Sequence, residues 1–461
     1  MTSTTAPGSV GRALDTLPPG PPALPFVGHL LQLQRDQLGF LLDCARHYGD
    51  VVPLQFGPRR VLLLNHPHDI ETVLVGKHRQ FVKGRFYRLL EPLLGKGLFT
   101  SEGDVWLRQR RLAQPAFHRE RIAGYGRIMV DYTTQLLDGW SDGQRRDIQT
   151  DMMALTLRTV SKALFDTDVA GEANELGEAL PIALAQLDRE INGLSLLVPA
   201  GWPTPGRLRL RRAVARLDRI VFGLIAERRA SGEDRGDLLS LLMGAQDEDG
   251  SRMTDRQLRD EAMTLILAGH ETTALALAWS WYLLATYPEV DGRLHQEVRS
   301  VLGDRAPTLD DLPRLPYVDM LLKEALRLYP PAIEFGRETR QACEVAGYEL
   351  PAGTNIVVTP WVVQRDPRWF DEPDRFWPER WSDGLAQRLP RFAYFPFGGG
   401  PRLCIGQSFA LMEAALVLAT VAQRYRLVLD SDTRAEPVIE PRLTMRLKYG
   451  LPMRVQRRQA A

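Results

Sequence analysis

The chain has 461 residues, of which 44% are hydrophobic and 25% are charged, a balance typical of a globular protein with a large core. Its formal net charge is only +1, so the whole molecule produces no field that would attract nucleic acid or anionic lipid. No linker-like, low-complexity or repeated segment divides the sequence. We therefore expect one large domain at 17–455, with a flexible arm at 1–16 and a short tail at 456–461.

Cysteine is sparse in this sequence, which contains Cys44, Cys343 and Cys404. Three cysteines cannot form a disulfide framework, and no Cys-x-x-Cys pair is present for zinc or an iron–sulfur cluster. The N-terminus lacks the basic and apolar regions of a secretory signal. No run approaches the ~18 apolar residues that a membrane span requires. These features predict a protein of the cytoplasm.

Short strands and then a long helical region are predicted along the first two thirds of the chain. Prolines and a glycine at 17–22 favour a stiff, extended entry segment. Two β-like runs at 51–56 and 61–65 are joined by a Gly-Pro turn, which predicts a hairpin. From about 69 to 303, apolar residues recur at three- and four-residue spacing, which predicts mainly helix.

The clearest predicted helix begins near Thr254 and ends before Pro288. Thr254 and Gln257 have the spacing of a capping box, and proline stops the helical pattern at the other end. A helix of about 33 residues is on the order of 50 Å long. Its middle, 262–285, is apolar on nearly all sides, so we expect it to run through the core.

Shorter elements are predicted after this helix. A second helix at about 317–328 ends before a Pro-Pro pair, and strand-like pieces follow at 348–350 and 354–359. A final helix is expected at about 404–425. The predicted fold class is mostly α, a helical core with small β-sheets.

The segment 397–406 reads Phe-Gly-Gly-Gly-Pro-Arg-Leu-Cys-Ile-Gly. Its glycines allow the backbone to approach a flat ligand closely. Cys404 precedes an apolar helix whose N–H groups favour a thiolate, and Arg402 adds positive charge. Such a thiolate can bind a haem iron and favour O–O cleavage. From the residues alone, a phosphate-binding loop, which lacks the Gly-Lys-Ser/Thr ending, and a cysteine packed in the core remain alternatives.

This segment resembles the cysteine-ligand signature of the cytochrome P-450 family, Phe-x-x-Gly-x-Arg-x-Cys-x-Gly. The matching residues are Phe397, Gly400, Arg402, Cys404 and Gly406. Three further family patterns occur in the family's order, and the similarity extends from about 17 to 453. The resemblance implies the cytochrome P-450 fold, in which haem b lies between the long central helix and the helix after the cysteine, with Cys404 as the iron's ligand. It also implies haem contacts from Pro396, Phe397, Gly398, Arg402, Ile405 and Gly406.

The segment Ala268-Gly269-His270-Glu271-Thr272-Thr273 lies in the apolar middle of the long helix. Polar groups are costly there unless they are satisfied, and the simplest interpretation is that Thr272 bonds back to the carbonyl of Ala268. The resemblance implies instead that Glu271 and Thr272 form an acid–alcohol pair that supplies protons during dioxygen activation. It places Ala268, Gly269 and Thr272 against the haem, with Gly269 leaving room for oxygen.

Glu324 and Arg327 are three residues apart on the second predicted helix. Such a pair is ordinarily a surface ion pair worth a few tenths of a kcal/mol. In the family the pair is buried and is joined by a second arginine, which Arg380 matches. The resemblance therefore implies a structural network that holds the region preceding the cysteine loop.

Trp106 and Arg110 are one helical turn apart and share a helix face. An indole N–H and a guanidinium are suitable donors to the propionates of a haem. A packed tryptophan beside a surface arginine is nevertheless the commoner arrangement. The resemblance implies that both residues form a propionate-binding cluster with Arg337 and Arg402.

The resemblance also implies a distal substrate pocket, although more coarsely. Its expected lining residues are Leu98, Phe99, Leu265, Ala268, Ile333, Glu334 and Met445. In an extended segment alternate residues share a side, so Glu334 points inward together with Ala332, or it points outward while its neighbours point inward. The outward or paired arrangement is favoured. If Glu334 points inward, the substrate carries a hydroxyl or an amine. A basic cluster at 83–88 could meet a carboxylate, although most such clusters are solvated.

Together these patterns predict a haem-thiolate monooxygenase that inserts one oxygen atom from O2 into a small hydrophobic substrate, such as a fatty acid, a terpenoid or another secondary metabolite. Few residues follow Cys404, so electrons are expected from a separate ferredoxin- or flavodoxin-type donor and its NAD(P)H reductase. Candidate docking residues for that donor are Arg108, Arg111, Arg119 and Arg121. We expect a bacterial monomer without a membrane anchor or a nucleic-acid partner. The alternatives are a peroxide-driven or redox-neutral haem enzyme and a non-catalytic haem-binding protein.

Overall fold

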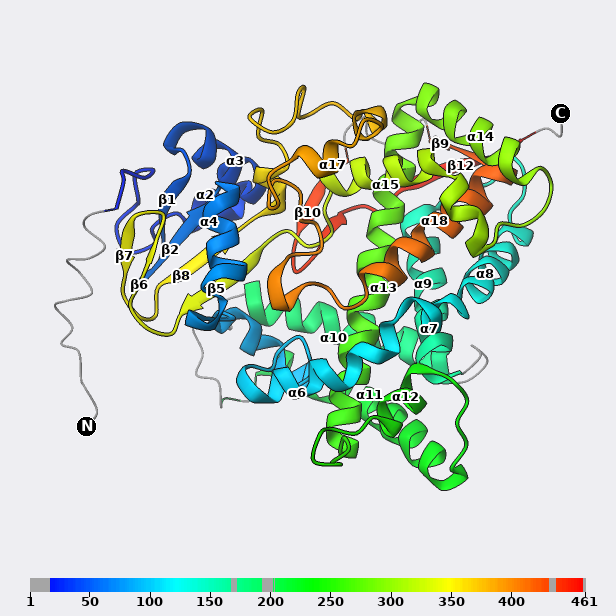
Figure 1. Ribbon diagram of the computed structural model, residues 1–461, viewed down its shortest axis with the longest axis horizontal. Coiled ribbons are helices and arrows are strands. Elements are labelled where there is room, and N and C mark those ends of the chain that lie inside the picture. Colours follow the sequence, from blue (N-terminus) through cyan, green and yellow to red (C-terminus); the bar gives the residue numbers. More distant parts are fainter. Residues whose placement is uncertain (1–16, 167–171, 193–201, 203, 431–436, 459–461) are drawn as a thin grey trace. The chain divides into compact units, whose positions relative to one another are not determined.

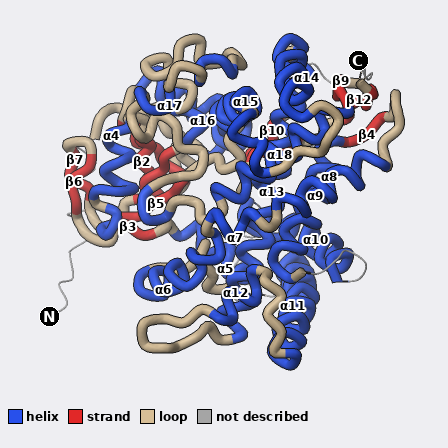
Figure 2. The backbone as a smooth tube through the Cα atoms, turned by 45° about the vertical axis from the view of Figure 1, so that its right-hand side comes forward, coloured by secondary structure: helices blue, strands red, loops and turns tan. Residues whose placement is uncertain are grey.

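The structure is a computed structural model that describes residues 17–166, 172–192, 202, 204–430 and 437–458. The predicted arm at 1–16 and the last three residues of the predicted tail lie outside the described residues. Helices make up most of the described chain and the strands form small sheets (Figures 1 and 2). The chain divides into two compact units, one from 17–86 and 326–404 and the other from 87–325 and 405–458.

The first unit is organised around a five-stranded sheet. In spatial order its strands are β1 (Val51–Phe56), β2 (Arg59–Leu64), β8 (Asn355–Val358), β5 (Phe335–Thr339) and β3 (Phe81–Val82). The strands β2 and β8 are parallel, and the other neighbours are antiparallel. The predicted first hairpin is confirmed, although its second strand begins two residues earlier than expected. Leu62, Leu64, Ile356 and Val358 are buried in one core, because alternate residues of a strand share a face.

Short helices and a second hairpin complete the first unit. The hairpin pairs β6 (Cys343–Val345) with β7 (Tyr348–Leu350). The helices are α2 (Leu30–Arg35), α3 (Gln37–Tyr48), α4 (Pro67–Glu71), α16 (Pro360–Val363) and α17 (Leu385–Arg388). Single turns of other helix types are η1 (Thr72–Gly76), η2 (His78–Gln80), η7 (Pro378–Trp381) and η8 (Gly400–Arg402). Two elements, η3 (Arg85–Leu90) and α15 (Pro316–Leu328), begin in one unit and end in the other.

The second unit is largely helical, and most of its helices are longer. They are α5 (Glu91–Leu94), α6 (Gly103–Ala113), α7 (Arg119–Ala123), α8 (Gly126–Asp138), α9 (Ile148–Phe165), α10 (Glu172–Asn192), α11 (Pro205–Ser231), α12 (Leu238–Gly244), α13 (Asp255–Thr286), α14 (Pro288–Leu302) and α18 (Gln407–Arg424), with the 3-10 turns η4 (Gln114–Phe117) and η6 (Leu309–Arg314). None of the described helices is both long enough and apolar enough to cross a membrane.

The central helix α13 agrees with its prediction at both ends. Thr254 caps it through a hydrogen bond from the backbone N–H of Gln257, in the predicted capping box, and Pro288 follows its last turn. Helices α9, α11 and α18 pack against α13 (Figure 1). Its apolar middle is buried for this reason.

The strands of the second unit lie in two small sheets. One contains β4 (Arg145–Asp147), β12 (Pro452–Arg457) and β9 (Tyr425–Leu429) in that order, and the other is the hairpin of β10 (Ile439–Pro441) and β11 (Met445–Leu447). The predicted domain end at 455 is two residues short, because β12 continues to Arg457, which is paired with Tyr425.

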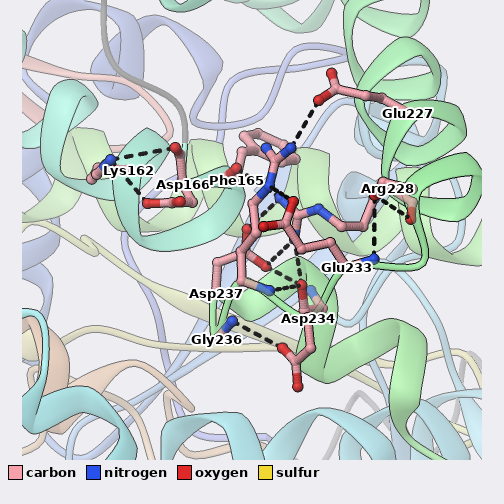
Figure 3. A network of polar contacts seen from close by, with 12 residues as sticks. Lys162, Phe165, Asp166, Glu227, Arg228, Glu233, Asp234, Gly236 and Asp237 are labelled. Carbon is pink, nitrogen blue, oxygen red and sulfur yellow. Dashed lines mark hydrogen bonds and ion pairs between the residues drawn. The ribbon is translucent and has the colours of Figure 1, made fainter.

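A buried ion pair stabilises the corner where the chain turns from α11 to α12 (Figure 3). Arg228 and Asp237 lie 2.7 Å apart, and their side chains are only 5% and 2% exposed. Arg228 also donates a hydrogen bond of 3.1 Å to the carbonyl of Phe165, the last residue of α9. The corner is therefore held to the end of α9 by an almost completely buried charge.

Candidate active site

The predicted cysteine loop lies in the first unit, and its backbone passes very close to neighbouring segments of that unit. Gly398 and Gly400 have φ angles of +72° and +68°, which favour glycine. A Cβ at Gly400 would collide with the carbonyl oxygen of Leu74, and one at Gly398 would lie 3.1 Å from the ring of Phe335. The loop is closed by a hydrogen bond of 3.1 Å from the Cys404 N–H to the Phe397 carbonyl. The glycines therefore allow the loop to fold tightly ahead of the cysteine.

Cys404 differs from the other two cysteines in its exposure. It is exposed, whereas Cys44 and Cys343 are buried. Burial raises the pKa of Cys44 to about 12 and raises that of Cys343 as well, so both are inert thiols. The interpretation of Cys404 as a packed core residue is therefore wrong. The predicted final helix starts at Gln407 rather than near 404, which leaves Cys404 in the loop that precedes α18.

The segment before β5 lies beside the cysteine loop in the same unit, as the contact between Phe335 and Gly398 shows. Ile333 is 1% exposed, and its carbonyl accepts a hydrogen bond of 2.6 Å from Thr359. Its side chain is therefore almost completely covered in this conformation, and its pocket role stays a prediction. Glu334 is half-buried on the alternate side of the segment and makes no hydrogen bond or ion pair with the described residues. Burial raises the pKa of Glu334.

The second unit contributes a short exposed window on α13. All residues between Leu258 and Leu284 are buried except Ala268, Gly269 and Thr272, which lie within one turn of the helix. The Thr272 hydroxyl donates a hydrogen bond of 2.6 Å to the Ala268 carbonyl, as the simplest interpretation predicted. A window of small residues in a buried helix suits contact with a flat ligand.

Gly269 has a packing role that the sequence did not suggest. A Cβ at this position would lie 3.0 Å from a methyl group of Val160 on α9. Contacts this short require the neighbour to move. The missing side chain thus lets α9 approach α13, and the room for oxygen beside Gly269 stays a prediction.

Glu271 lies beside this window but has its own partners. Its carboxylate accepts a hydrogen bond of 2.7 Å from Arg446 Nε and a short one from the Thr444 hydroxyl. Burial raises its pKa, but the hydrogen bond and charge of Arg446 and the hydrogen bond of Thr444 outweigh burial and lower the pKa below its ordinary value. The Glu271 carboxylate and the Thr272 hydroxyl are consequently bonded to different groups. Neither Thr444 nor Arg446 was predicted, because the resemblance related only Met445, between them, to the helix 173 residues before Thr444.

The predicted pocket residues of the second unit are mostly buried. Leu98 and Leu265 are each 8% exposed, and Met445 is completely buried, with its carbonyl accepting a hydrogen bond of 2.9 Å from the Trp279 indole. The Met445 side chain is therefore covered in this conformation, and its pocket role stays a prediction. Phe99 is half-buried and packs edge-on against Tyr87 at 5.4 Å between ring centres.

The loop that carries Leu98 and Phe99 is fastened to α13 by two neighbouring acids. The Lys96 N–H donates a hydrogen bond of 2.8 Å to Asp260, and the Leu98 N–H donates one of 3.1 Å to Glu261. Burial raises the pKa of Glu261 to about 8. The adjacent Asp-Glu pair in the first turns of the helix is the sequence signal that indicates this anchor.

The predicted propionate-binding residues are divided between the units. Trp106 and Arg110 are half-buried on one face of α6, and Arg337 and Arg402 belong to the first unit. Arg337 is 9% exposed and donates a hydrogen bond of 2.8 Å to the carbonyl of Gly336. Each unit thus presents cationic donors of the kind that haem propionates require.

The two arginines with a predicted structural role are buried hydrogen-bond donors in the first unit. Arg327 is fully buried and donates to the carbonyls of Gln364, Pro373 and Arg375, and Arg380 also donates to the Arg375 carbonyl. Gln364 was not predicted, yet it donates to the Arg327 carbonyl and accepts from the N–H of Phe395, just before the cysteine loop. Glu324, in the second unit, is fully buried as well.

Two of the four suggested docking arginines are paired with acids. Arg108 lies 3.1 Å from Asp247, and Arg111 lies 2.5 Å from Glu248. The side chains of Arg119 and Arg121 lie outside the described residues, as does that of Arg85 in the basic cluster at 83–88. Arg108 and Arg111 therefore provide no unneutralised charge for a redox partner.

Comparison with known proteins identifies the class to which this fold and these motifs belong. Residues 18–453 match the Cytochrome P450 family, so the chain is a member of that family and has its haem-thiolate type of cofactor. It is 42% identical to cyclooctatin synthase of Streptomyces melanosporofaciens over 95% of both chains. It is also 39% identical to cyclooctat-9-en-7-ol 5-monooxygenase of the same organism, over 91% of this chain and 93% of that one.

A solved structure confirms the predicted fold class. The crystal structure of cytochrome P450DA heme domain matches with a TM-score of 0.87 at 29% sequence identity, over 96% of this chain and 98% of that chain. The fold is therefore the mostly α cytochrome P450 fold. The family and the monooxygenase among the relatives make this chain an oxidoreductase of the monooxygenase class, which takes electrons from redox partners and acts on a hydrophobic substrate.

Proposed function

We propose that this chain hydroxylates a polycyclic terpenoid, with haem b bound through the sulfur of Cys404. The observation that carries the assignment of the ligand is the exposed Cys404 at the end of a tightly folded glycine loop, while both other cysteines are buried. The terpenoid is supported by the relatives, one of which is named for an alcohol of this kind. Fatty acids and other secondary metabolites are the competing substrates.

When bound, the haem supplies dioxygen activation, and the chain's own residues bind, orient and move protons. Trp106, Arg110, Arg337 and Arg402 are the proposed donors to its propionates. The window of Ala268, Gly269 and Thr272 on α13 and the loop segment 396–406 are its proposed contacts. Glu271 and Thr272 are the proposed proton donors, and Leu98, Phe99, Leu265 and Glu334 are proposed to surround the substrate.

The two units together are proposed to form one catalytic domain, which works as a monomer in a bacterial cytoplasm. Electrons are proposed to come from a ferredoxin- or flavodoxin-type protein with its NAD(P)H reductase. A turnover that requires NAD(P)H and the reductase supports this reaction. Turnover with peroxide alone would favour the peroxide-driven alternative.

The ligand assignment is tested by changing each cysteine and recording the spectrum of the ferrous–CO complex. Cys404→His should remove the red-shifted Soret band of a thiolate-ligated haem. Cys343→Ser is the matched control, because Cys343 is buried in the first unit and should keep that band. Loss of the band in the control and its retention in Cys404→His would reject the assignment.

The substrate class is tested by a spin-state titration of the ferric protein with fatty acids in one series and polycyclic terpene alcohols in another. A blue shift of the Soret band reports displacement of an axial water by a ligand that fills the pocket. A shift with the terpene alcohols alone supports the proposal. A shift with fatty acids alone makes the chain a fatty-acid hydroxylase instead.

A further inference from the structure

The loop at 95–101 lies directly on the first half of α13. A Cβ at Gly95 would collide with the carboxylate of Asp260, and one at Gly97 would collide with the hydroxyl of Thr264. Because neither glycine has a side chain, the backbone of the loop can reach the surface of the helix. The turn of α13 between Asp260 and Thr264 therefore determines where the loop lies.

The loop is also closed on itself. The Thr100 hydroxyl donates a hydrogen bond of 2.7 Å to the Gly95 carbonyl, and the Thr100 N–H donates one of 3.1 Å to the Gly97 carbonyl. Leu98 and Phe99 lie within this closed segment. The contacts that hold the loop on α13 consequently also position these two side chains, which are proposed to surround the substrate.

Two adjacent acids of α13 accept hydrogen bonds from the backbone of the loop, and their surroundings differ. Asp260 accepts from the Lys96 N–H. It also lies 3.0 Å from Arg259 and 3.4 Å from Arg256, so cations neutralise its charge. Glu261 forms no ion pair with the described residues. Of the two acids, only Glu261 would be buried as an uncompensated charge.

The Glu261 carboxyl is a buried acceptor of one hydrogen bond. Its Oε2 accepts a hydrogen bond of 3.1 Å from the Leu98 N–H, and its Oε1 is buried without a hydrogen-bond partner among the described residues. Burial, together with the negative charge of Asp260, raises the pKa of Glu261 to about 8, although the bond from Leu98 acts in the opposite direction. Glu261 is therefore a neutral acid near pH 7.

Asp260 is the one charged group among the described residues that acts on the Glu261 carboxyl. Asp218 on the neighbouring helix α11 is engaged in an ion pair. Neither Glu91 on α5 nor Lys162 on α9 acts on Glu261, and α12 carries no charged residue. Ionisation of Glu261 would therefore create a second buried anion beside Asp260.

We propose that Glu261 is a positioning residue of the substrate site, which holds the 95–101 loop on α13 as a neutral acid and releases it on ionisation. In the neutral acid, Oε2 is the carbonyl oxygen that accepts from Leu98, and Oε1 carries the proton. Loss of that proton leaves a buried anion that only water entering between the loop and the helix can solvate. The link to the substrate rests on the proposed function, whereas the movement of the loop concerns the protein alone.

The direction of the pH dependence follows from the two positions of the loop. When the loop leaves the helix, Glu261 is solvated and its pKa returns toward the ordinary value of 4.5. Between this value and about 8, the closed loop keeps a proton that the open loop has lost. Closure should therefore weaken by up to about tenfold for each unit that the pH rises in this range.

Hydrogen exchange of the loop amides in the holo-protein tests this movement, with each rate compared with that of an unfolded peptide to give a protection factor. The wild-type protection factor should fall about tenfold or more between about pH 6 and about pH 8. Glu261→Gln keeps an oxygen acceptor but has no proton to lose, so its protection should not depend on pH. Glu261→Leu removes the acceptor and should lower protection about 2- to 12-fold near pH 6. A wild-type loop without pH dependence, or the same dependence in Glu261→Gln, overturns the proposal.

The matched control is Glu297→Gln, which changes an acid of the same kind elsewhere in the second unit. Glu297 on α14 is half-buried and accepts from the N–H groups of Tyr317 and Val318 at 2.8 and 3.1 Å. Burial raises its pKa as well. This variant should keep the wild-type exchange at 95–101 and its pH dependence. Loss of the pH dependence in the control would overturn its assignment to Glu261.

The link to the substrate is tested by spin-state titration with the terpene alcohol that gives the largest shift. Glu261→Leu should weaken binding about 2- to 12-fold, because the loop is closed less often. Glu261→Gln should restore most of the affinity, and Glu297→Gln should bind as the wild type does. Altered exchange with unchanged affinities would overturn the link to the substrate while leaving the role of Glu261 in the loop. If no terpenoid binds the wild type, the proposed substrate fails, and hydrogen exchange still decides the role of Glu261.

Discussion

Arg327 in the first unit and Glu271 in the second are both buried charged groups, and the hydrogen bonds described for them differ in kind. Arg327 donates to three backbone carbonyls. Glu271 accepts from two side chains, and one of them reaches solvent. Backbone acceptors move only if the chain itself moves, whereas a side-chain donor can rotate away and return.

The comparison teaches which buried charges serve structure and which can take part in chemistry. A fixed set of carbonyls suits a group that must never change, such as the guanidinium that holds the region before the cysteine loop. A carboxylate that accepts hydrogen bonds from mobile side chains stays ionised while those bonds are made. It can take up a proton when they break. The predictions below test this distinction from the largest expected effect to the smallest.

The largest effect is expected for Arg327→Met. The change leaves the carbonyls of Gln364, Pro373 and Arg375 without their buried donor, which should lower the free energy of unfolding by about 3–5 kcal/mol and leave little haem-loaded protein. Arg375→Met is the control, because that side chain makes an exposed ion pair with Glu372 and should change stability by about 0–1 kcal/mol. Urea unfolding and haem content measure both, and an Arg327→Met protein as stable as the control would contradict the structural role.

Glu413 shows a third way to bury a titratable group. It is fully buried, and a hydrogen bond with Thr159 only partly offsets the effect of burial on its carboxyl group. Burial therefore raises the pKa of Glu413 from 4.5 to about 8. Between these pH values the folded protein keeps a proton that the unfolded chain has lost, so stability should fall as the pH rises.

Glu413→Gln should remove part of this pH dependence. One such group contributes about 1.4 kcal/mol of stability per pH unit within its window. Glu261, whose pKa is also raised to about 8 by burial, should maintain a similar slope in the variant. Urea unfolding at about pH 6 and about pH 8 measures the slope. A variant with the wild-type slope would show that Glu413 does not hold its proton.

Much of the fold and of the cysteine loop could be predicted because their signals are local. The capping box at Thr254, the proline after α13 and the apolar middle of that helix are all contiguous in sequence. The glycine loop that ends in Cys404 is likewise a single segment. Such signals depend on backbone geometry and periodicity, which a sequence displays directly.

The partners of the site residues could not be predicted in the same way. The bonds from Thr444 and Arg446 to Glu271 and from Gln364 to Phe395 join segments far apart in sequence. A polar side chain carries no sign of which distant group it will meet. Alternation was similarly insufficient for Glu334, because it predicts opposite sides for neighbours without saying which side is buried.

Thr272→Ala should have little effect on stability and a large effect on the coupling of O2 consumption to product formation. The hydroxyl donates a hydrogen bond to a carbonyl of its own helix, and such a bond contributes little to folding. The free energy of unfolding should therefore change by less than about 0.5 kcal/mol. Product formed per O2 consumed should fall about tenfold or more if the hydroxyl moves protons. Thr273→Ala is the neighbouring control, since the Thr273 hydroxyl is buried without a hydrogen-bond partner among the described residues. Equal uncoupling in both variants would assign the effect to helix packing.

The smallest effect is expected for Glu334, the half-buried acid without a partner among the described residues. If it receives a hydroxyl of the substrate, Glu334→Leu should weaken the binding of the terpene alcohol cedrol about 2- to 12-fold, the value of one hydrogen bond, and should not weaken that of the parent hydrocarbon cedrane. Glu338→Leu, four residues along the same side of the segment, should bind both ligands as the wild type does. Spin-state titration gives the four affinities. An equal change for alcohol and hydrocarbon would mean that Glu334 affects only the volume of the site, because removal of a hydrogen-bond partner must discriminate between two ligands that differ by one hydroxyl.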